Sequence, residues 1–282
     1  MTAEGEEGEE GEEGGFPSIS MWNTAKNGFG DMISDKYQGV GHVASPGMAL
    51  PGGLGPDAAR IFKLLPGTPV SVSTIDAHAG VPGVGVSGAG TLVAVMGTSG
   101  CYMLNAKTDV QVHGCLGKVH DGIQKGYVGM EMGQSAMGDL FAWLSRTTNR
   151  DIHELAREAG EERQRRLTRG TSGDADGSGR RRTPMALDWF NGCRSPHNDG
   201  SLMGGIVQLD LTTTPGDLYL ALAEGLACGA RQMTSSFVDA GVPVDRVVAA
   251  GGLPHNAPLL MQMFADALQR PVHITETKQS GA

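Results

Sequence analysis

The C-terminal third of the chain alternates between helix-like and strand-like apolar patterns, and this alternation constrains the fold more than any other feature of the sequence. Thr214-Pro215-Gly216-Asp217 has the form of a capping box with proline at the first helical position. Apolar spacing then predicts a helix to about Ala240, with Gly241 closing it. We expect a strand over 247–250, a turn over 251–256, a helix over 259–268 and a strand over 272–275. This order predicts an α/β layer.

A similar pattern lies upstream. Residues 70–75 predict a strand that ends at Asp76, and a glycine-rich passage then leads to a continuous apolar strand over 91–96. Gly97-Thr98-Ser99-Gly100 separates that strand from another over 101–104, which predicts a hairpin. After Gly133-Gln134-Ser135 we expect a helix to about Arg146.

Three other segments have a different character. Residues 1–15 repeat a Gly-Glu-Glu unit and are expected to form a disordered acidic tail. Residues 16–66 are rich in Pro-Gly turns, with one short helix expected over 55–65. A charged helix and then a Gly/Ser/Asp-rich stretch predict a flexible surface insertion at about 160–183, whose arginines either attract an anion or are simply solvated.

Charge and composition exclude several classes of protein. Seven glutamates in the first thirteen residues account for most of the net charge of −9, and the remainder carries −2, so no basic surface predicts nucleic-acid binding. No apolar run reaches the ~18 residues of a membrane span, and no secretory leader is recognisable. The four scattered cysteines form no C-x-x-C pair, which predicts neither a zinc site nor a disulfide framework and favours the cytoplasm.

Two of the candidate site segments follow predicted strands closely. Asp76, at the end of a strand, is placed to accept a proton from a substrate hydroxyl, or merely caps the next turn. The Gly97-Thr98-Ser99-Gly100 turn offers backbone N–H groups and hydroxyls to a phosphate, or is an ordinary hairpin link. It is not a Walker loop, because no G-x-x-x-x-G-K-[ST] occurs in the chain.

Two further segments have the same ambiguity. Gly251 and Gly252 follow a strand, and their missing side chains would let a flat base or a phosphate approach the main chain. Asn256 either caps the next helix or contacts a nucleotide with its amide. Glu131 either stabilises the dipole of a following helix or accepts hydrogen bonds from sugar hydroxyls.

In combination these segments resemble the FGGY carbohydrate kinases, and within them the ribulokinase branch. The resemblance covers about residues 21–282, with a poor match over 146–183. Its motifs are Ile75-Asp76-Ala77-His78-Ala79-Gly80, Met96-Gly97-Thr98-Ser99, Gly126 to Ala136, Leu187-Asp188-Trp189-Phe190-Asn191-Gly192-Cys193-Arg194-Ser195-Pro196, and Gly251-Gly252-Leu253-Pro254-His255-Asn256. The Asp-Trp-Phe-Asn-Gly string is the most specific of them.

The resemblance implies a role for each matching residue. Asp76 matches the general base and also contacts the sugar, and Glu131 matches a contact to the ketose. The residues implied in binding ATP are Gly97, Thr98, Gly138, Gly251, Gly252 and Asn256. The family uses ATP with Mg²⁺ and a small sugar, with no nucleic acid or membrane partner, and leaves a homo-oligomer open. Its fold is two α/β lobes of the actin-like ATPase, ribonuclease-H-like type.

The chain also departs from the family pattern. The Asp-x-Gly-Thr hairpin that opens the family is missing, so we expect an incomplete kinase fold: 16–75 as a remnant of the first lobe and 76–282 as the C-terminal, nucleotide-binding lobe. We therefore expect little turnover of L-ribulose to L-ribulose 5-phosphate by the isolated chain. The alternatives are a non-catalytic remnant that binds sugar or nucleotide, another FGGY pentulose kinase, or a different actin-like ATPase.

Overall fold

The structure is a computed structural model that describes residues 45–171 and 183–277, the side chains of 169–171 excepted. It divides into two compact units, Met1–Ser73 and Thr74–Ala282, which are described separately. The expected tail at 1–15 lies outside the described residues, as does 172–182 of the expected insertion; residues 160–171 are helical.

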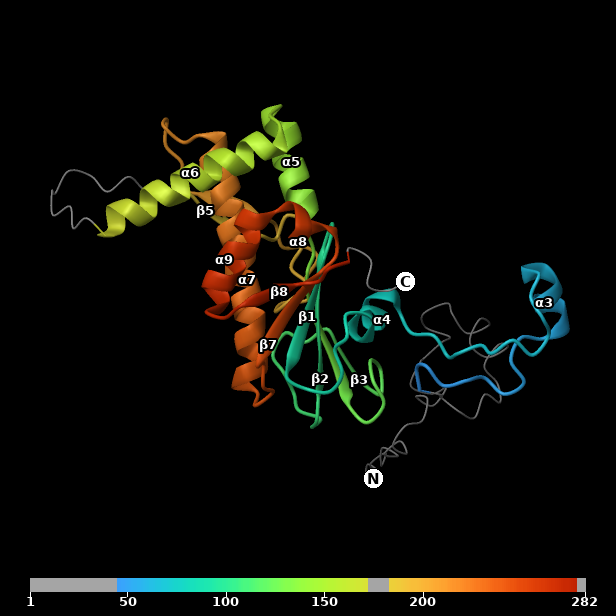
Figure 1. The fold of residues 1–282 in the computed structure, drawn as a ribbon. Coiled ribbons are helices and arrows are strands. Elements are labelled where there is room, and N and C mark those ends of the chain that lie inside the picture. Colours follow the sequence, from blue (N-terminus) through green and yellow to red (C-terminus); the bar gives the residue numbers. More distant parts are fainter. Residues whose placement is uncertain (1–44, 172–182, 278–282) are drawn as a thin grey trace, which may run out of the picture. The chain divides into compact units, whose positions relative to one another are not determined.

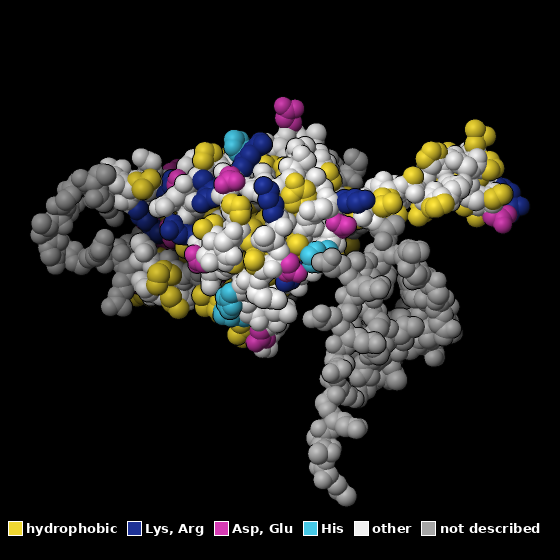
Figure 2. Space-filling model, turned by 90° about the horizontal axis from the view of Figure 1, so that it is seen from below, with side chains coloured by type: hydrophobic (Ala, Val, Ile, Leu, Met, Phe, Trp, Pro, Cys, Tyr) yellow, Lys and Arg dark blue, Asp and Glu magenta, His cyan; other side chains and the backbone are white. Residues whose placement is uncertain are grey.

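The first unit contains the short helix expected over 55–65, which is confirmed as α3 (Pro56–Phe62). It begins with proline at the first helical position and ends at Lys63 in a left-handed conformation. Apolar side chains gather on the surface of this unit (Figure 2), among them Ile61, Phe62, Leu64 and Leu65.

The strand expected over 70–75 is wrong. Only Ser71 forms a bridge, to Ala49, and Asp76 begins a helix, α4 (Asp76–Gly83). A strand needs a neighbour along its whole length to satisfy its backbone groups. Here the neighbouring segment, 47–50, bonds the main chain of Val70 and Val72 and does not continue along the rest of 70–75, although the sequence alternates as a strand would.

The second unit is built on a six-stranded sheet in the order β3-β4-β2-β1-β7-β8. Its strands are β1 (Thr91–Met96), β2 (Gly100–Ala106), β3 (Gly117–His120), β4 (Val128–Gln134), β7 (Arg246–Ala250) and β8 (Val272–Ile274). The first four pair antiparallel, whereas β1, β7 and β8 run parallel. The strand over 91–96 and its hairpin are confirmed.

The two faces of the sheet are covered unequally (Figure 1). One face packs against α5 (Gly138–Thr148), α7 (Pro215–Asp239) and α9 (Pro258–Leu268), and α6 (Ile152–Thr171) packs on α7. The other face is covered by α4 through a small apolar cluster that includes Val81, Val93 and Met103. A separate two-stranded sheet, β5 (Met185–Leu187) and β6 (Gly205–Val207), packs on α7 through β5.

Local signals predicted α7 well. Thr214 Oγ1 accepts from the Asp217 amide at 3.2 Å, and Asp217 Oδ2 accepts from the Thr214 amide at 2.8 Å, so the capping box is confirmed. The helix ends at Asp239, and Gly241, one residue past its C-cap, has φ +82°.

The turn expected over 251–256 is wrong. Residues Gly252–Asn256 form a short helix, α8, and Asn256 is its last residue. Asn256 therefore does not cap α9, whose N-cap is Ala257.

The strand β4 was not predicted from the sequence, although Val128, Met130 and Met132 alternate with small or polar residues as a half-buried strand would.

Candidate active site

The parallel pairing of β1 with β7 brings two glycine turns together. Val95 is paired with Ala250, so both strands end at the same edge of the sheet. The Gly97-Thr98 turn after β1 and the Gly251-Gly252 start of α8 after β7 therefore lie next to each other at that edge. In α/β sheets this edge is where ligands bind.

Two glycines allow the close packing of this edge. Gly251 has φ +98°, and a Cβ on it would lie 2.4 Å from the Met96 carbonyl oxygen. A Cβ on Gly138 would lie 2.8 Å from the Gly97 carbonyl oxygen. The Gly138 amide donates to that same oxygen at 3.0 Å, which fastens the start of α5 to the turn. No other residue type fits at these two positions without movement of the main chain.

Two other glycines form the open side of the same edge. A Cβ on Gly97 or on Gly252 would meet nothing within 4 Å, and Thr98 is exposed. The main chain is therefore accessible where the two turns meet. The Gly97 amide already donates to the Ser99 carbonyl oxygen at 2.9 Å, so the exposed Thr98 hydroxyl and the other backbone N–H groups of this edge are the donors that suit a phosphate or a nucleotide.

Asn256 lies on the same short helix as Gly252. Its side-chain Nδ2 donates to the Gly252 carbonyl oxygen at 3.0 Å, and the side chain is otherwise exposed. The neighbouring His255 has a buried Nε2 with no hydrogen-bond partner among the described residues. An orphaned buried nitrogen beside an open turn fits a site that is completed by a ligand or a water.

Residues 92–282 match the FGGY family of carbohydrate kinases, C-terminal domain. The chain belongs to this family. It is 42% identical over 227 residues to a ribulokinase from Anoxybacillus flavithermus, covering 80% of this chain and 40% of that protein. It is 38% identical over 269 residues to a ribulokinase from Shouchella clausii, covering 95% and 47%.

Solved structures agree on the fold. A xylulose kinase from Lactobacillus acidophilus has a TM-score of 0.70 at 16% identity, covering 89% of this chain and 48% of that one. A xylulose kinase from Rhodospirillum rubrum has a TM-score of 0.64 at 24% identity, covering 84% and 46%. The FGGY chain thus has the expected actin-like sugar-kinase fold in part, and it spans about half the length of these relatives.

Asp76 lies on the lightly covered face of the FGGY sheet. As the first residue of α4 it is exposed, and its Oδ1 accepts from the Ala77 amide at 2.7 Å. No hydrogen bond joins its carboxylate to either glycine turn within the described part of the chain. Its position comes from a helix start and not, as expected, from a strand end.

Glu131 lies in the middle of β4, with no helix directly after it. Its Oε2 is 3.2 Å from His78 Nε2, and its Oε1 accepts from Arg194 Nη2 at 3.1 Å. The hydrogen bond from His78 is the largest cause of a lowered Glu131 pKa, and the Arg194 charge adds to it. His78 is two residues beyond Asp76 on α4, so the sugar-side candidates share one face of the sheet.

Sequence reasoning missed His78 and Arg194 as site residues. Both stand inside the motifs that carry the family resemblance, so a signal was present. It could not identify their common partner, because they are separated from Glu131 by 53 and 63 residues.

The two groups of candidates lie along one sheet. Glu131 is paired with Met103 across β2 and β4, and Gly100, three residues nearer the Gly97 turn, is paired with Gln134. Three residues of strand span about 10 Å. Glu131 therefore lies about 10 Å along the sheet from the end of β2 that adjoins the Gly97 turn.

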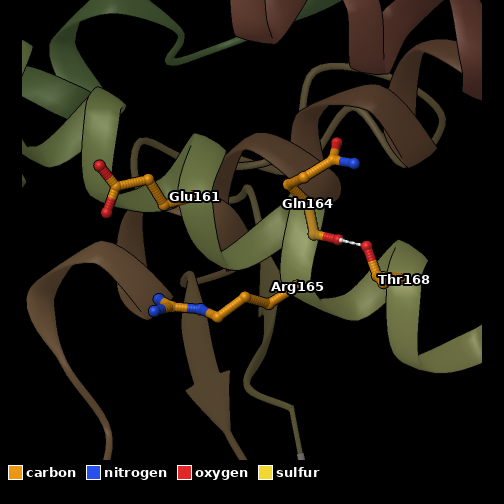
Figure 3. Close-up of a pocket in the computed structure, with 4 residues that line it drawn as sticks. All are labelled: Glu161, Gln164, Arg165 and Thr168. Carbon is orange, nitrogen blue, oxygen red and sulfur yellow. Dashed lines mark hydrogen bonds between the residues drawn. The ribbon is translucent and has the colours of Figure 1, made fainter.

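A surface hollow of about 430 Å³ lies elsewhere, on α6 (Figure 3). Its lining residues are Glu161, Gln164, Arg165 and Thr168, and none of the candidate site residues contributes to it.

In the described residues no helix is long and apolar enough to span a membrane. Nor do they bring three or more His, Cys, Asp or Glu side chains together in a way that could hold a metal ion.

Proposed function

We propose that this chain supplies the ATP-binding lobe and the catalytic base of a ribulokinase-like sugar kinase. The reaction would transfer the γ-phosphoryl group of ATP to a hydroxyl of ribulose, giving L-ribulose 5-phosphate from L-ribulose. Membership of the FGGY family and the identity to proteins named ribulokinase support this proposal.

The observation that carries it is the open glycine edge. Gly97 and Gly252 face free space at the edge where β1 and β7 both end, and Gly138 and Gly251 lock the main chain beneath them. A phosphate chain that binds the exposed main chain and the Thr98 hydroxyl at this edge needs no Walker loop. We place the adenine side of the nucleotide at Gly252 and Asn256 on α8.

On the sugar side, Asp76 would take the proton from the hydroxyl as its oxygen forms a bond to the γ-phosphorus and the bond to the β-phosphate oxygen breaks. Glu131 would accept hydrogen bonds from other sugar hydroxyls. Mg²⁺ bound with the nucleotide would supply charge neutralisation at the phosphates. We place the reaction in the cytoplasm, where the free cysteines of the chain would stay reduced.

The nucleotide site is tested by measuring the affinity of the 282-residue chain for ADP with calorimetry. Gly252→Ala and Gly97→Ala each add one methyl group to open space, so they should leave the fold intact while weakening ADP binding about tenfold or more. Gly117→Ala and Gly205→Ala, which also meet nothing within 4 Å, are matched controls and should bind ADP as the unchanged chain does. Equal ADP affinity in all five proteins would refute the proposed nucleotide position.

A second assay addresses the base. Any L-ribulose-dependent release of ADP should fall by about a hundredfold to ten-thousandfold in Asp76→Asn. If the chain binds ADP and ribulose but shows no turnover, it acts as a binding lobe and not as an enzyme in this form. Turnover that survives Asp76→Asn would contradict the role of Asp76.

A further inference from the structure

Glu131 is held through both of its carboxylate oxygens. Arg194 binds one of its carboxylate oxygens and His78 approaches the other, so each oxygen has its own partner. The side chains of Glu131 and His78 are 16% and 14% exposed, whereas that of Arg194 is 37% exposed. The group is therefore shielded but still reached by solvent.

Arg194 reaches Glu131 because its loop is fastened to β4. The Ser195 amide donates to the Gly133 carbonyl oxygen at 3.0 Å, and Ser195 Oγ accepts from the Gly133 amide at 3.1 Å. Cys193 and Asp199 exchange a pair of backbone hydrogen bonds of 2.9 Å that close the loop. These four bonds leave the loop little freedom to move away from the strand.

Gly133 makes room for the guanidinium. A Cβ at this position would lie 3.0 Å from Arg194 Cζ and 3.1 Å from its Nε, tighter than most real contacts. The arginine therefore packs against the bare main chain at Gly133. Gly133 is two residues from Glu131, so the two positions share one face of β4. The absent side chain and the fastened loop together fix the direction from which Arg194 approaches.

We propose that Arg194 is a positioning residue for sugar recognition, which with His78 holds the Glu131 carboxylate in one orientation as an acceptor for pentulose hydroxyls. This inference rests on the proposed function. A carboxylate offers about four acceptor directions. His78, Arg194 and the Cys101 thiol use three of them, so one remains for the sugar. An acceptor that is already oriented loses less conformational freedom when it binds a ligand.

A purely stabilising role explains the contacts of Glu131 with His78 and Arg194 less well than a role in sugar recognition. An ion pair that is partly removed from water contributes little net stability compared with apolar side chains of similar size. Here Glu131, His78 and Arg194 converge on the lightly covered face that also carries Asp76. Two cysteines also contact this cluster: Cys101, whose Sγ lies 3.8 Å from Arg194 Nη1 and bonds the Glu131 carboxylate, and Cys115, whose Sγ donates to the Glu131 carbonyl oxygen at 3.4 Å.

The experiment measures L-ribulose and ADP affinities of the full chain by calorimetry. Arg194→Met should weaken ribulose binding about tenfold, the loss typical of one charge-assisted hydrogen bond, and leave ADP binding unchanged. Its melting temperature should fall somewhat, because Glu131 loses one partner of a partly buried ion pair. Arg194→Lys should restore part of the affinity, because it keeps the charge and loses the planar fork. Arg231→Met is the matched control, since Arg231 is exposed on α7 and its Nη1 donates to the Ala267 carbonyl oxygen at 2.8 Å.

Gly133→Ala gives a second test in which no charge is removed. It should displace the guanidinium and weaken ribulose binding, again with ADP binding retained. If the unchanged chain binds ribulose and both Arg194→Met and Gly133→Ala bind it equally well, Arg194 has no positioning role, although the proposed function stands. If the unchanged chain binds ADP but no ribulose, the sugar half of the proposed function fails, and this inference fails with it.

Discussion

Replacing Gly251 with alanine should destabilise the second unit far more than the same change at Gly252. Gly251 has φ +98° and ψ −175°, a region of backbone conformation that is essentially restricted to glycine. A residue with a side chain there costs of order 1–3 kcal/mol. The new Cβ would also lie 2.4 Å from the Met96 carbonyl oxygen, well inside contact distance.

The packing around Met96 adds to the cost. Met96 is 1% exposed in the main apolar core and at the end of a central strand, so it cannot move aside freely. Overpacking of such a site costs typically about 1–3 kcal/mol. Strain and overpacking together predict a loss of roughly 4 kcal/mol of unfolding free energy, or about 8–16 °C in melting temperature for a domain of this size.

Gly252→Ala is the matched comparison, because it adds the same methyl group one residue later. Gly252 begins α8, lacks a positive φ and faces open space, so the change in unfolding free energy should stay within about 1 kcal/mol. Thermal and urea unfolding of both variants, followed by circular dichroism, measures the difference. A Gly251→Ala protein that melts within about 3 °C of the unchanged chain would refute the close approach of β7 to Met96.

Two further predictions concern stability. Thr214→Ala removes one half of the capping box of α7 and should cost about 1 kcal/mol in urea unfolding, whereas Ser236→Ala on the exposed face of the same helix should cost almost nothing. Burial raises the pKa of Asp188, so its ionised form weakens the folded state once the pH exceeds the ordinary aspartate range. Asp188→Asn can still accept the hydrogen bond from Gln134, so it should raise the melting temperature at pH 7. This gain should shrink as the pH falls toward the ordinary aspartate pKa. A gain that does not depend on pH would contradict the burial argument.

Elements with local signals were predictable from the sequence. The capping box at Thr214 and the apolar spacing after it predicted α7 almost to its ends, and continuous apolar residues predicted β1. The glycines at 97 and 251 were recognised because they follow buried strands. Such features depend on residues within one or two turns of each other, so a linear reading contains the necessary information.

Elements that depend on a distant partner were not predictable in this way. Residues 70–75 alternate like a strand but have a ladder partner at one position only, and β4 was missed although it lies between β2 and β3 in the sheet. The short helix α8 replaced an expected turn, and it removed one of the two roles considered for Asn256, that of the α9 cap.

The candidate site shows the same division. The sequence by itself determined which residue types are present: a carboxylate at 76, another at 131, and glycines where the main chain must be bare. Only the tertiary structure decided that Gly138 and Gly251 lock onto the end of β1, and that His78 and Arg194 meet at Glu131. The reason is physical: local spacing sets what each segment can bury or bond, while strand register and packing across the sheet set which distant segments it meets.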